Sequence, residues 1–230
     1  MHILITGGAG SLGSNLALRL GKEDGHDITY WDTMINGVDV GDWRHVQKAA
    51  QAIEKLDILV NCAGVSLVEW FEDIDPSDFQ RVMDINCNGI INCTQALLPV
   101  LRNGGTVCNI LSNAAHVPMT ASIAYNASKA AATMVTRQMA HELGPRHGIT
   151  VFGVSPNKMA GTGALNRYTA NRVAQVRGWP ADEVQRRQLA ALPAKEETPV
   201  EVVAEFIAFL LTDKQRHRFL QGCIIPYGCP

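Results

Sequence analysis

The stretch HILITGGAGSLG, residues 2–13, decides the fold expected for this chain. Its first five residues are mostly apolar and predict a strand, and the glycine-rich turn that follows opens a helix predicted for about 11–22. Gly7 suits the tight turn, Gly10 a close approach of backbone to a pyrophosphate, and Gly13 close packing of the helix. The helix would direct its N-terminal partial positive charge at the phosphates. The spacing therefore predicts a dinucleotide site in a βαβ unit.

Outward from this turn, short apolar segments alternate with helical ones, which predicts an α/β protein with a Rossmann-like, doubly wound sheet. Seven mostly parallel strands are predicted over residues 2–6, 27–32, 37–40, 57–61, 105–112, 148–155 and 223–226. Helices on both faces are predicted over about 11–22, 43–55, 76–101, 123–143 and 199–211. The connection over 33–39 is too short for a crossover helix, so one helix is expected to be missing there.

The 230 residues are expected to form one NAD-binding domain, because no repeat or linker divides the chain. The polar segment at about 157–197 lies where loops carry specificity in such sheets, and it is the expected substrate lid. Its seven basic residues against four acidic ones hint mildly at an anionic substrate, although exposed faces of lid helices would show the same excess. The substrate itself is not readable from this segment.

Composition excludes several classes of function. With 47% hydrophobic and 18% charged residues and a net charge of −2, the chain gives no reason to expect nucleic acid or a membrane as partner. No apolar run approaches the roughly 20 residues that span a bilayer, and the N-terminus lacks the basic start of a signal peptide. The six cysteines show no metal-binding spacing, so no metal site is expected, and a reducing cytoplasm is the default.

A second pattern carries chemistry. Tyr125 and Lys129 are four residues apart in YNASK, which places a phenol and an ammonium on one face of a predicted helix. Ser112, at the end of the preceding predicted strand, is expected to meet them across a cleft. A lysine charge about 4 Å away is worth roughly 4 kcal/mol at an effective dielectric of about 20 and favours the ionised phenol, which burial opposes. Such a tyrosine can exchange a proton with a carbonyl oxygen near neutral pH.

Asp32 ends the second predicted strand, nineteen residues beyond Gly13. A carboxylate there can accept hydrogen bonds from both ribose hydroxyls of NAD, and it would repel the 2′-phosphate of NADP. No arginine or lysine lies between Thr6 and Leu18 to receive that phosphate. The sequence therefore predicts NAD as cofactor, with NADP disfavoured.

Together these segments resemble the short-chain dehydrogenase/reductase family, from residue 1 to about 228. The motifs that carry the resemblance are, in chain order, TGGAGSLG at 6–13, Asp39-Val40, NCAG at 61–64, Asn86, Ser112, YNASK at 125–129 and Pro156. Ser11 stands where the compact branch of the family usually has glycine, so the turn matches that of the extended branch. Asn157 stands where glycine commonly follows the proline, and the tail reads IIPYGCP. The resemblance is thus to a compact, single-domain member with an extended-type glycine motif.

The resemblance implies a role for each matched position. Asn86, Ser112, Tyr125 and Lys129 would form the catalytic tetrad, with Tyr125 as general acid in reduction and base in oxidation. Ser112 would hold the substrate oxygen, Lys129 the nicotinamide ribose, and Asn86 a water in the proton relay. The residues implied to contact the cofactor are Gly7, Gly10, Ser11, Leu12, Gly13, Asp32, Asp39, Val40, Asn61, Ala63, Gly64, Tyr125, Lys129, Pro156 and Thr162.

The expected function is hydride transfer between NAD(H) and a carbonyl or secondary alcohol. Two alternatives stay open: a nucleotide-sugar epimerase or dehydratase, suggested by the glycine turn, and a non-catalytic NAD-binding sensor. The first would need a C-terminal substrate domain, and only 101 residues follow Lys129. The resemblance also implies a homodimer or homotetramer assembled through the helices predicted within 76–101 and 123–143.

Overall fold

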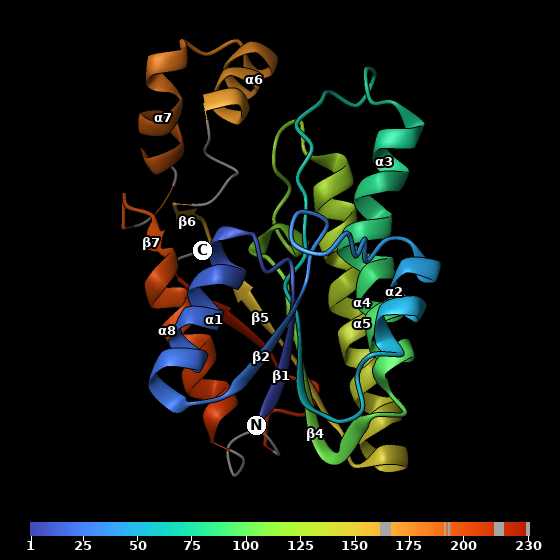
Figure 1. Cartoon of the computed structure of the whole chain (residues 1–230). Coiled ribbons are helices and arrows are strands. Elements are labelled where there is room, and N and C mark those ends of the chain that lie inside the picture. Colours follow the sequence, from blue (N-terminus) through green and yellow to red (C-terminus); the bar gives the residue numbers. More distant parts are fainter. Residues whose placement is uncertain (162–166, 191, 193, 214–218, 229–230) are drawn as a thin grey trace.

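A parallel sheet of six strands, in the order β2-β1-β3-β4-β5-β8, forms the centre of the described chain (Figure 1). The structure, a computed structural model, describes residues 1–161, 167–190, 192, 194–213 and 219–228, without the side chains of 22–24, 102 and 167–169. The strands are β1 (His2–Thr6), β2 (Asp27–Trp31), β3 (Leu56–Asn61), β4 (Leu101–Ile110), β5 (Thr150–Pro156) and β8 (Ile224–Tyr227). β3 is buried along its whole length, as in a parallel sheet covered on both faces.

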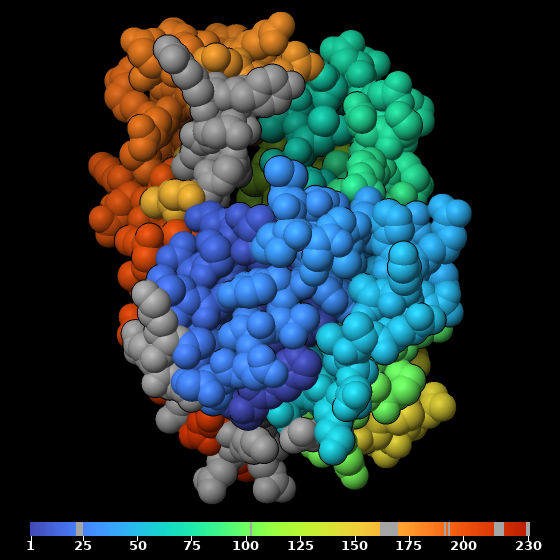
Figure 2. All heavy atoms as spheres, in the orientation of Figure 1, coloured from blue at the N-terminus to red at the C-terminus, as the bar shows by residue number. Residues whose placement is uncertain are grey.

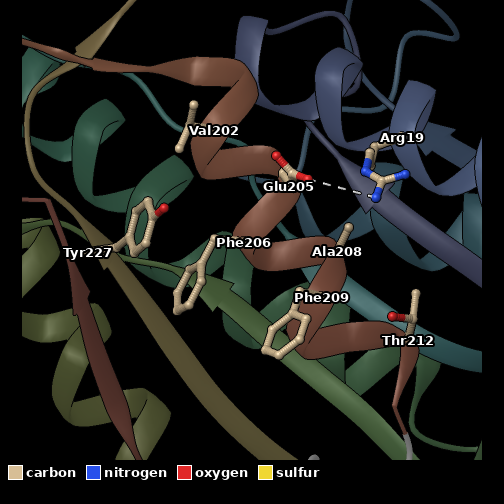
Figure 3. A pocket seen from close by; sticks show the side chains of 8 residues that line it. All are labelled: Arg19, Val202, Glu205, Phe206, Ala208, Phe209, Thr212 and Tyr227. Atoms are coloured by element: carbon tan, nitrogen blue, oxygen red, sulfur yellow. Dashed lines mark ion pairs between the residues drawn. The ribbon is translucent and has the colours of Figure 1, made fainter.

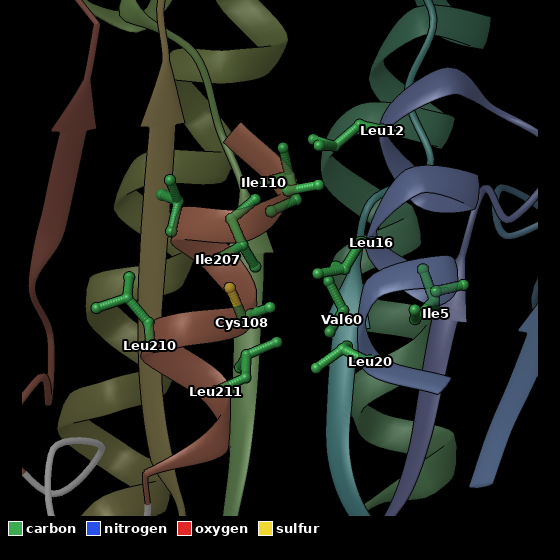
Figure 4. Close-up of a cluster of buried hydrophobic side chains, with 14 of the residues drawn as sticks. Ile5, Leu12, Leu16, Leu20, Val60, Cys108, Ile110, Ile207, Leu210 and Leu211 are labelled. Carbon is green, nitrogen blue, oxygen red and sulfur yellow. The ribbon is translucent and has the colours of Figure 1, made fainter. Parts of the chain in front are cut away.

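Helices cover both faces of this sheet. On one face lie α1 (Ser11–Asp24) and α8 (Val200–Thr212), and on the other α2 (Trp43–Ala50), α4 (Gly89–Leu97) and α5 (Ile123–His147). Figure 4 shows the hydrophobic core between the sheet and the helices α1 and α8, where Leu16, Leu20 and Ile207 meet Ile5 and Val60 of the sheet. The expected Rossmann-like, doubly wound α/β architecture is confirmed.

The remaining elements lie near the carboxyl ends of the strands or join the helices. α3 (Pro76–Met83) continues into the π-helix η1 (Asp84–Asn88), and short 3-10 helices occur at η2 (Asn113–Ala115) and η4 (Ala181–Glu183). α6 (Arg167–Arg177) and α7 (Val184–Ala190) form the upper left of Figure 1, and residues 167–190 are called the α6–α7 segment below. The strands β6 (Met159–Ala160) and β7 (Thr198–Pro199) pair at its base, and this pair is called the stem.

The direction of winding reverses at β1. The chain leaves β1 for β2 on one side and then crosses to β3 on the other, since β1 pairs with both in parallel register. In such sheets the ligand crevice lies outside the carboxyl ends of the two strands at the reversal. Here those ends are Thr6 and Asn61, each followed at once by a segment predicted to bind the cofactor.

The prediction of a strand over 37–40, third in chain order, is wrong, because these residues form a loop. Gly37 adopts a φ of +71°, which is incompatible with extended backbone, and Val40 is buried in the core under α2. The chain therefore passes from β2 to α2 without adding an outer strand, and β2 is the edge of the described sheet. The expected loss of a crossover helix at 33–39 agrees with this loop.

Several boundaries also differ from expectation. β4 begins at Leu101 rather than near 105, and its register against β3 shifts between Leu56 and Ile58. It ends at Ile110, so Ser112 follows the strand rather than closing it. α5 runs to His147 through Pro145, beyond the expected end at 143. The stem was not expected, because its two-residue strands are too short to give a sequence pattern.

Candidate active site

The glycine turn lies against the end of β3. Gly7 has a φ of +70°, and a Cβ there would lie 2.7 Å from Cα of Ala63. The Thr6 hydroxyl accepts hydrogen bonds from the backbone N–H groups of Cys62 (3.0 Å) and Ala63 (3.1 Å). Thr6 therefore locks the two strand ends at the reversal point together, a role that sequence reasoning missed although its place before the turn was visible.

Three glycines shape the turn in different ways. A Cβ on Gly13 would overlap the carbonyl oxygen of Gly7, which agrees with the close helix packing expected there. Gly10 caps α1, and its Cβ would come within 3.1 Å of that same oxygen. Gly8, not singled out from the sequence, lies so close to the Tyr30 ring that a Cβ would overlap it. The turn therefore packs against the Tyr30 ring of β2 as well as against the end of β3.

The N-terminus of α1 fits an anionic group. Its N-cap is Gly10, which offers no side-chain cap, and its first turn carries no acidic residue. The N–H groups of a first helical turn have no intrahelical acceptor, and the helix dipole favours negative charge there. This arrangement fits the pyrophosphate of a dinucleotide. Ser11 and Leu12 are the first two residues of that turn.

Asp32 lies beside the same turn. Its carboxylate accepts hydrogen bonds from the backbone N–H groups of Ala9 (3.0 Å) and Met34 (2.8 Å), one on each oxygen. The carboxylate is therefore held at the carboxyl end of β2, next to the glycine loop, where the ribose of a dinucleotide would reach it.

Other residues expected to touch the cofactor have partners inside the protein. Asp39 forms an ion pair with Arg81 of α3 (2.7 Å), and Val40 is buried beneath the loop. The amide of Asn61 donates to the Asn109 side chain (2.8 Å). Pro156 ends β5, and Thr162 lies outside the described residues.

Lys129 and Tyr125 share one face of α5, as their spacing predicts. The Lys129 ammonium is 5.9 Å from the centre of the Tyr125 ring and donates a hydrogen bond to the Ile110 carbonyl (2.9 Å). Only 5% of Lys129 is exposed, so this charge is held inside the protein. Gly64 lies close to both Lys129 and Asn86, since a Cβ on Gly64 would be 3.7 Å from the Lys129 nitrogen and 3.4 Å from the Asn86 side-chain oxygen.

Asn86 lies at the centre of the π-helix η1 and is fully buried. Its amide group donates to the Val65 carbonyl (2.8 Å) and to the Ser128 hydroxyl (2.9 Å), and its oxygen accepts from the Val65 N–H (2.8 Å). Ser128 in turn donates to the Tyr125 carbonyl (2.8 Å). Asn86 therefore ties the loop after β3 to the helix that carries Tyr125. Single π-turns of this kind are frequent at functional sites.

Ser112 caps the short helix η2, where its oxygen accepts the N–H of Ala114 (3.2 Å). The hydroxyl hydrogen is not used in that contact. The loop after Ser112 is fastened to α5 by Asn126, whose amide donates to the carbonyls of Ala114 (2.6 Å) and Val117 (2.7 Å). Ser112 and Tyr125 thus belong to one connected unit at the carboxyl end of β4.

The α6–α7 segment contacts the loops on either side of this unit. The indole N–H of Trp70 donates to the Val176 carbonyl (2.7 Å), and Arg177 donates to the Thr120 carbonyl (2.8 Å). Arg172 forms an ion pair with Glu69. Figure 2 shows this segment, in orange, above the blue N-terminal part of the chain and beside the teal segment around 70–80.

A separate groove of about 350 Å³ lies between α1, α8 and β8. Figure 3 shows the Phe206 and Tyr227 rings stacked in it, 4.1 Å apart, and the Arg19–Glu205 pair (4.0 Å) at its rim. None of the expected catalytic residues lines this groove. It is therefore not the candidate active site.

The described part of the chain shows neither a metal-binding cluster nor a membrane-spanning helix. No group of three or more His, Cys, Asp or Glu side chains there is placed to bind a metal ion. No helix there combines the length and the apolar character needed to cross a bilayer. Five cysteines are described, and all five are free thiols.

Comparisons with known proteins identify the family. The family model for short chain dehydrogenases matches residues 31–172. Carbonyl reductase (NADPH) 2 of Sus scrofa is 32% identical over 181 residues, 77% of this chain and 69% of that protein. L-xylulose reductase of Homo sapiens is 29% identical over 180 residues, with the same coverage of 77% and 69%. NAD+-bound xylitol dehydrogenase shares the fold with a TM-score of 0.88 at 24% identity, over 100% of this chain and 98% of that one.

The chain belongs to the short-chain dehydrogenase/reductase family. It is an oxidoreductase of the class that acts on carbonyl and alcohol groups with a nicotinamide cofactor. The similar proteins include NADPH-named and NAD-bound members, so the family alone leaves the choice of dinucleotide open.

Proposed function

We propose that this protein transfers a hydride between NAD(H) and a carbonyl or secondary alcohol, with Tyr125 as general acid and base. The observation that carries the proposal is the buried ammonium of Lys129 beside the Tyr125 ring, on the helix face that the YNASK motif predicts. The nicotinamide would supply or accept the hydride. The protein's own task is then to hold the substrate oxygen and to move one proton at the Tyr125 phenol oxygen.

Each tetrad residue has a task that its contacts support. The Ser112 hydroxyl, whose oxygen already accepts the Ala114 N–H, would donate its hydrogen to the substrate oxygen and stabilise developing negative charge. Lys129 would hold the nicotinamide ribose and keep a positive charge beside the phenol. Asn86 holds Val65 and Ser128 with its side chain, so we propose that it positions the site rather than touching substrate, and that water reaches Lys129 beside it.

We propose NAD rather than NADP as the cofactor. Two backbone N–H groups fix the Asp32 carboxylate, and an adenosine ribose bound beside it would bring a 2′-phosphate close to that negative charge. Neither the glycine turn nor the loop over 33–42 contains an arginine or lysine. The first basic side chain after β2 is Arg44, which pairs with Asp42 (3.2 Å).

We propose that the chain is a single domain and that residues 157–197 are its substrate lid. Of the six basic side chains that the structure describes in this region, four are in ion pairs: Lys158 with Glu197 (2.8 Å), Arg172 with Glu69, and Arg186 and Arg187 with Glu183 (2.5 and 2.7 Å). Few positive charges are therefore left to attract an anion, which favours an uncharged substrate. Ketoses and sugar alcohols, which the names of several similar proteins mention, belong in the first panel of substrates.

We propose a homo-oligomer in the cytoplasm. Ile91 of α4 and Met134 of α5 are 39% and 61% exposed on the helices expected to form a subunit contact, and the groove of Figure 3, with Phe209 51% exposed, offers a second apolar face. Light scattering of the wild type, Met134→Glu and Phe209→Glu would show whether either face joins subunits. Free thiols at Cys62 and Cys108 suit a reducing compartment.

The first experiment is titration of the purified protein with NADH and with NADPH, followed by reduced-nicotinamide fluorescence. Binding of NADH at least about tenfold tighter, or about 1.4 kcal/mol, would support the proposal. The reverse order would contradict the cofactor assignment, and binding of neither would contradict the whole proposal. Turnover of a sugar nucleotide with NAD retained would favour an epimerase, and NADH binding with no turnover across the carbonyl panel would favour a sensor.

A further inference from the structure

Ser11 connects two parts of the molecule that are far apart in sequence. It is the first residue of α1, and its hydroxyl donates a hydrogen bond of 2.6 Å to the carbonyl oxygen of Gly161, 150 residues further along the chain. Gly161 directly follows β6 of the stem. One short side chain therefore links the phosphate-binding turn to the base of the α6–α7 segment.

The residues just before Gly161 are held by the stem. β6 pairs with β7 through Met159↔Thr198 and Ala160↔Pro199, and the Thr198 N–H donates to the Lys158 carbonyl (3.1 Å). Gly161 itself has a φ of +72°. The stem thus presents the Gly161 carbonyl toward α1, and Ser11 supplies its hydrogen-bond donor.

The position of Ser11 also matters for a bound dinucleotide. Its backbone N–H belongs to the first turn of α1, whose N–H groups lack intrahelical acceptors and face an anion. Its side chain reaches in another direction, to the stem. A hydroxyl has one hydrogen to donate, so a Ser11 that donates to Gly161 leaves only backbone donors of this residue for the phosphates.

We propose that Ser11 is a positioning residue that fastens the stem to the phosphate-binding turn and thereby slows release of the dinucleotide. The second part of this inference rests on the proposed function, because it needs a dinucleotide at the N-terminus of α1. The first part does not, because the Ser11–Gly161 contact exists without one. Glycine at this position would leave the turn intact and remove the fastening.

The test compares three variants. Ser11→Ala removes the hydroxyl, and Ser11→Thr retains one and serves as the rescue. Ser14→Ala is the matched control, because it makes the same chemical change on α1 but removes only a contact within the helix, from the Ser14 hydroxyl to the Ser11 carbonyl (3.1 Å).

Two readouts separate the parts of the inference. Hydrogen exchange of the protein without cofactor is measured for peptides covering 157–161 and 196–200, and the NADH dissociation rate is measured by stopped-flow fluorescence. In Ser11→Ala we expect both to rise by about two- to tenfold, the range for one hydrogen bond, with wild-type behaviour in Ser14→Ala and recovery in Ser11→Thr.

Unchanged exchange of the stem in Ser11→Ala would overturn the inference, even if NADH bound more weakly, because Ser11 would then act on the phosphates directly. Faster exchange with an unchanged dissociation rate would overturn the link to cofactor release. If the wild type binds neither NADH nor NADPH, the proposed function fails, while the exchange comparison still decides whether Ser11 fastens the stem.

Discussion

The ammonium of Lys129 is anchored to the sheet and directed at Tyr125, since it donates to the Ile110 carbonyl at the end of β4 while lying 5.9 Å from the ring centre. The end of β4 therefore fixes the position of the charge. An ammonium held in this way would lose little further conformational entropy in the proton transfer proposed for the phenol.

Replacing Tyr125 by phenylalanine removes the hydroxyl that we propose as proton donor and keeps the ring beside Lys129. We expect turnover to fall by at least about 10²-fold, the usual contribution of general acid–base catalysis, with NADH binding retained. The measurement is steady-state turnover on the best carbonyl substrate, beside the fluorescence titration. Unaltered turnover would exclude Tyr125 as the acid and base.

Replacing Asp32 by asparagine removes its charge and keeps an oxygen that can accept the Ala9 N–H. We expect the ratio of NADPH to NADH affinity to rise by about tenfold or more, because repulsion of about 1.4 kcal/mol from a 2′-phosphate is lost. Asp27→Asn, an exposed position at the other end of β2, is the control and should leave the ratio unchanged. Equal ratios in both variants would contradict the assignment of Asp32.

Replacing the buried Asn86 by alanine removes the hydrogen-bond partner of the Val65 N–H and carbonyl and of the buried Ser128 hydroxyl. We expect the free energy of unfolding to fall by about 1–3 kcal/mol, the cost of leaving buried polar groups unpaired. Asn88→Ala is the control on the same π-turn, because its amide donates to Asp84 (2.8 Å) in a less buried place. Urea unfolding of both variants checks the difference, and a larger loss in Asn88→Ala would contradict this account.

Two glycines of α1 should respond to alanine in opposite ways. At Gly13 the methyl group would overlap the Gly7 carbonyl, so we expect lower stability and weaker NADH binding. At Gly21 it would meet only Ile28, at an ordinary 3.6 Å, so we expect a gain of about 0.5–1 kcal/mol from helix propensity. Thermal unfolding of the two variants measures both, and the same sign in both would contradict the packing described for the turn.

Thiol reactivity should follow burial. Burial raises the pKa of Cys62 to about 12, despite the nearby Lys129 charge, and also raises the pKa of Cys93. A raised pKa leaves almost no thiolate at pH 8 and more as pH rises, so alkylation of the native protein should spare both and label the exposed Cys223. Peptide mapping by mass spectrometry measures the order. Labelling of Cys62 as fast as Cys223 would contradict it, and unfolded protein is the control.

The features that follow from local spacing were predictable from the sequence. The turn at Gly7 and the shared helix face of Tyr125 and Lys129 depend only on neighbouring residues, and the structure has both. The extra strand at 37–40 was predicted wrongly, because four apolar or turn-forming residues do not reveal whether the chain passes beside the sheet edge or beneath a helix.

Contacts between distant segments were not predictable. Asn61, the last residue of β3, was predicted to line the cofactor, and its place in the sequence does not reveal that its amide donates to Asn109 on the neighbouring strand. Ser11 shows only a departure from glycine, and nothing in the sequence connects it with Gly161. Both depend on tertiary packing, which a pattern of residue types does not encode.

The loop that follows β2, where a strand was expected over 37–40, also covers part of the edge of the sheet. An outermost strand offers free backbone groups on which a foreign chain can polymerise. Here Asn36 accepts the N–H of Asp32 (3.0 Å) and donates to the carbonyl of Tyr30 (2.7 Å), so its side chain pairs two backbone groups at the carboxyl end of this edge. At this end of β2 a foreign strand would therefore have to displace Asn36 before it could pair with the sheet.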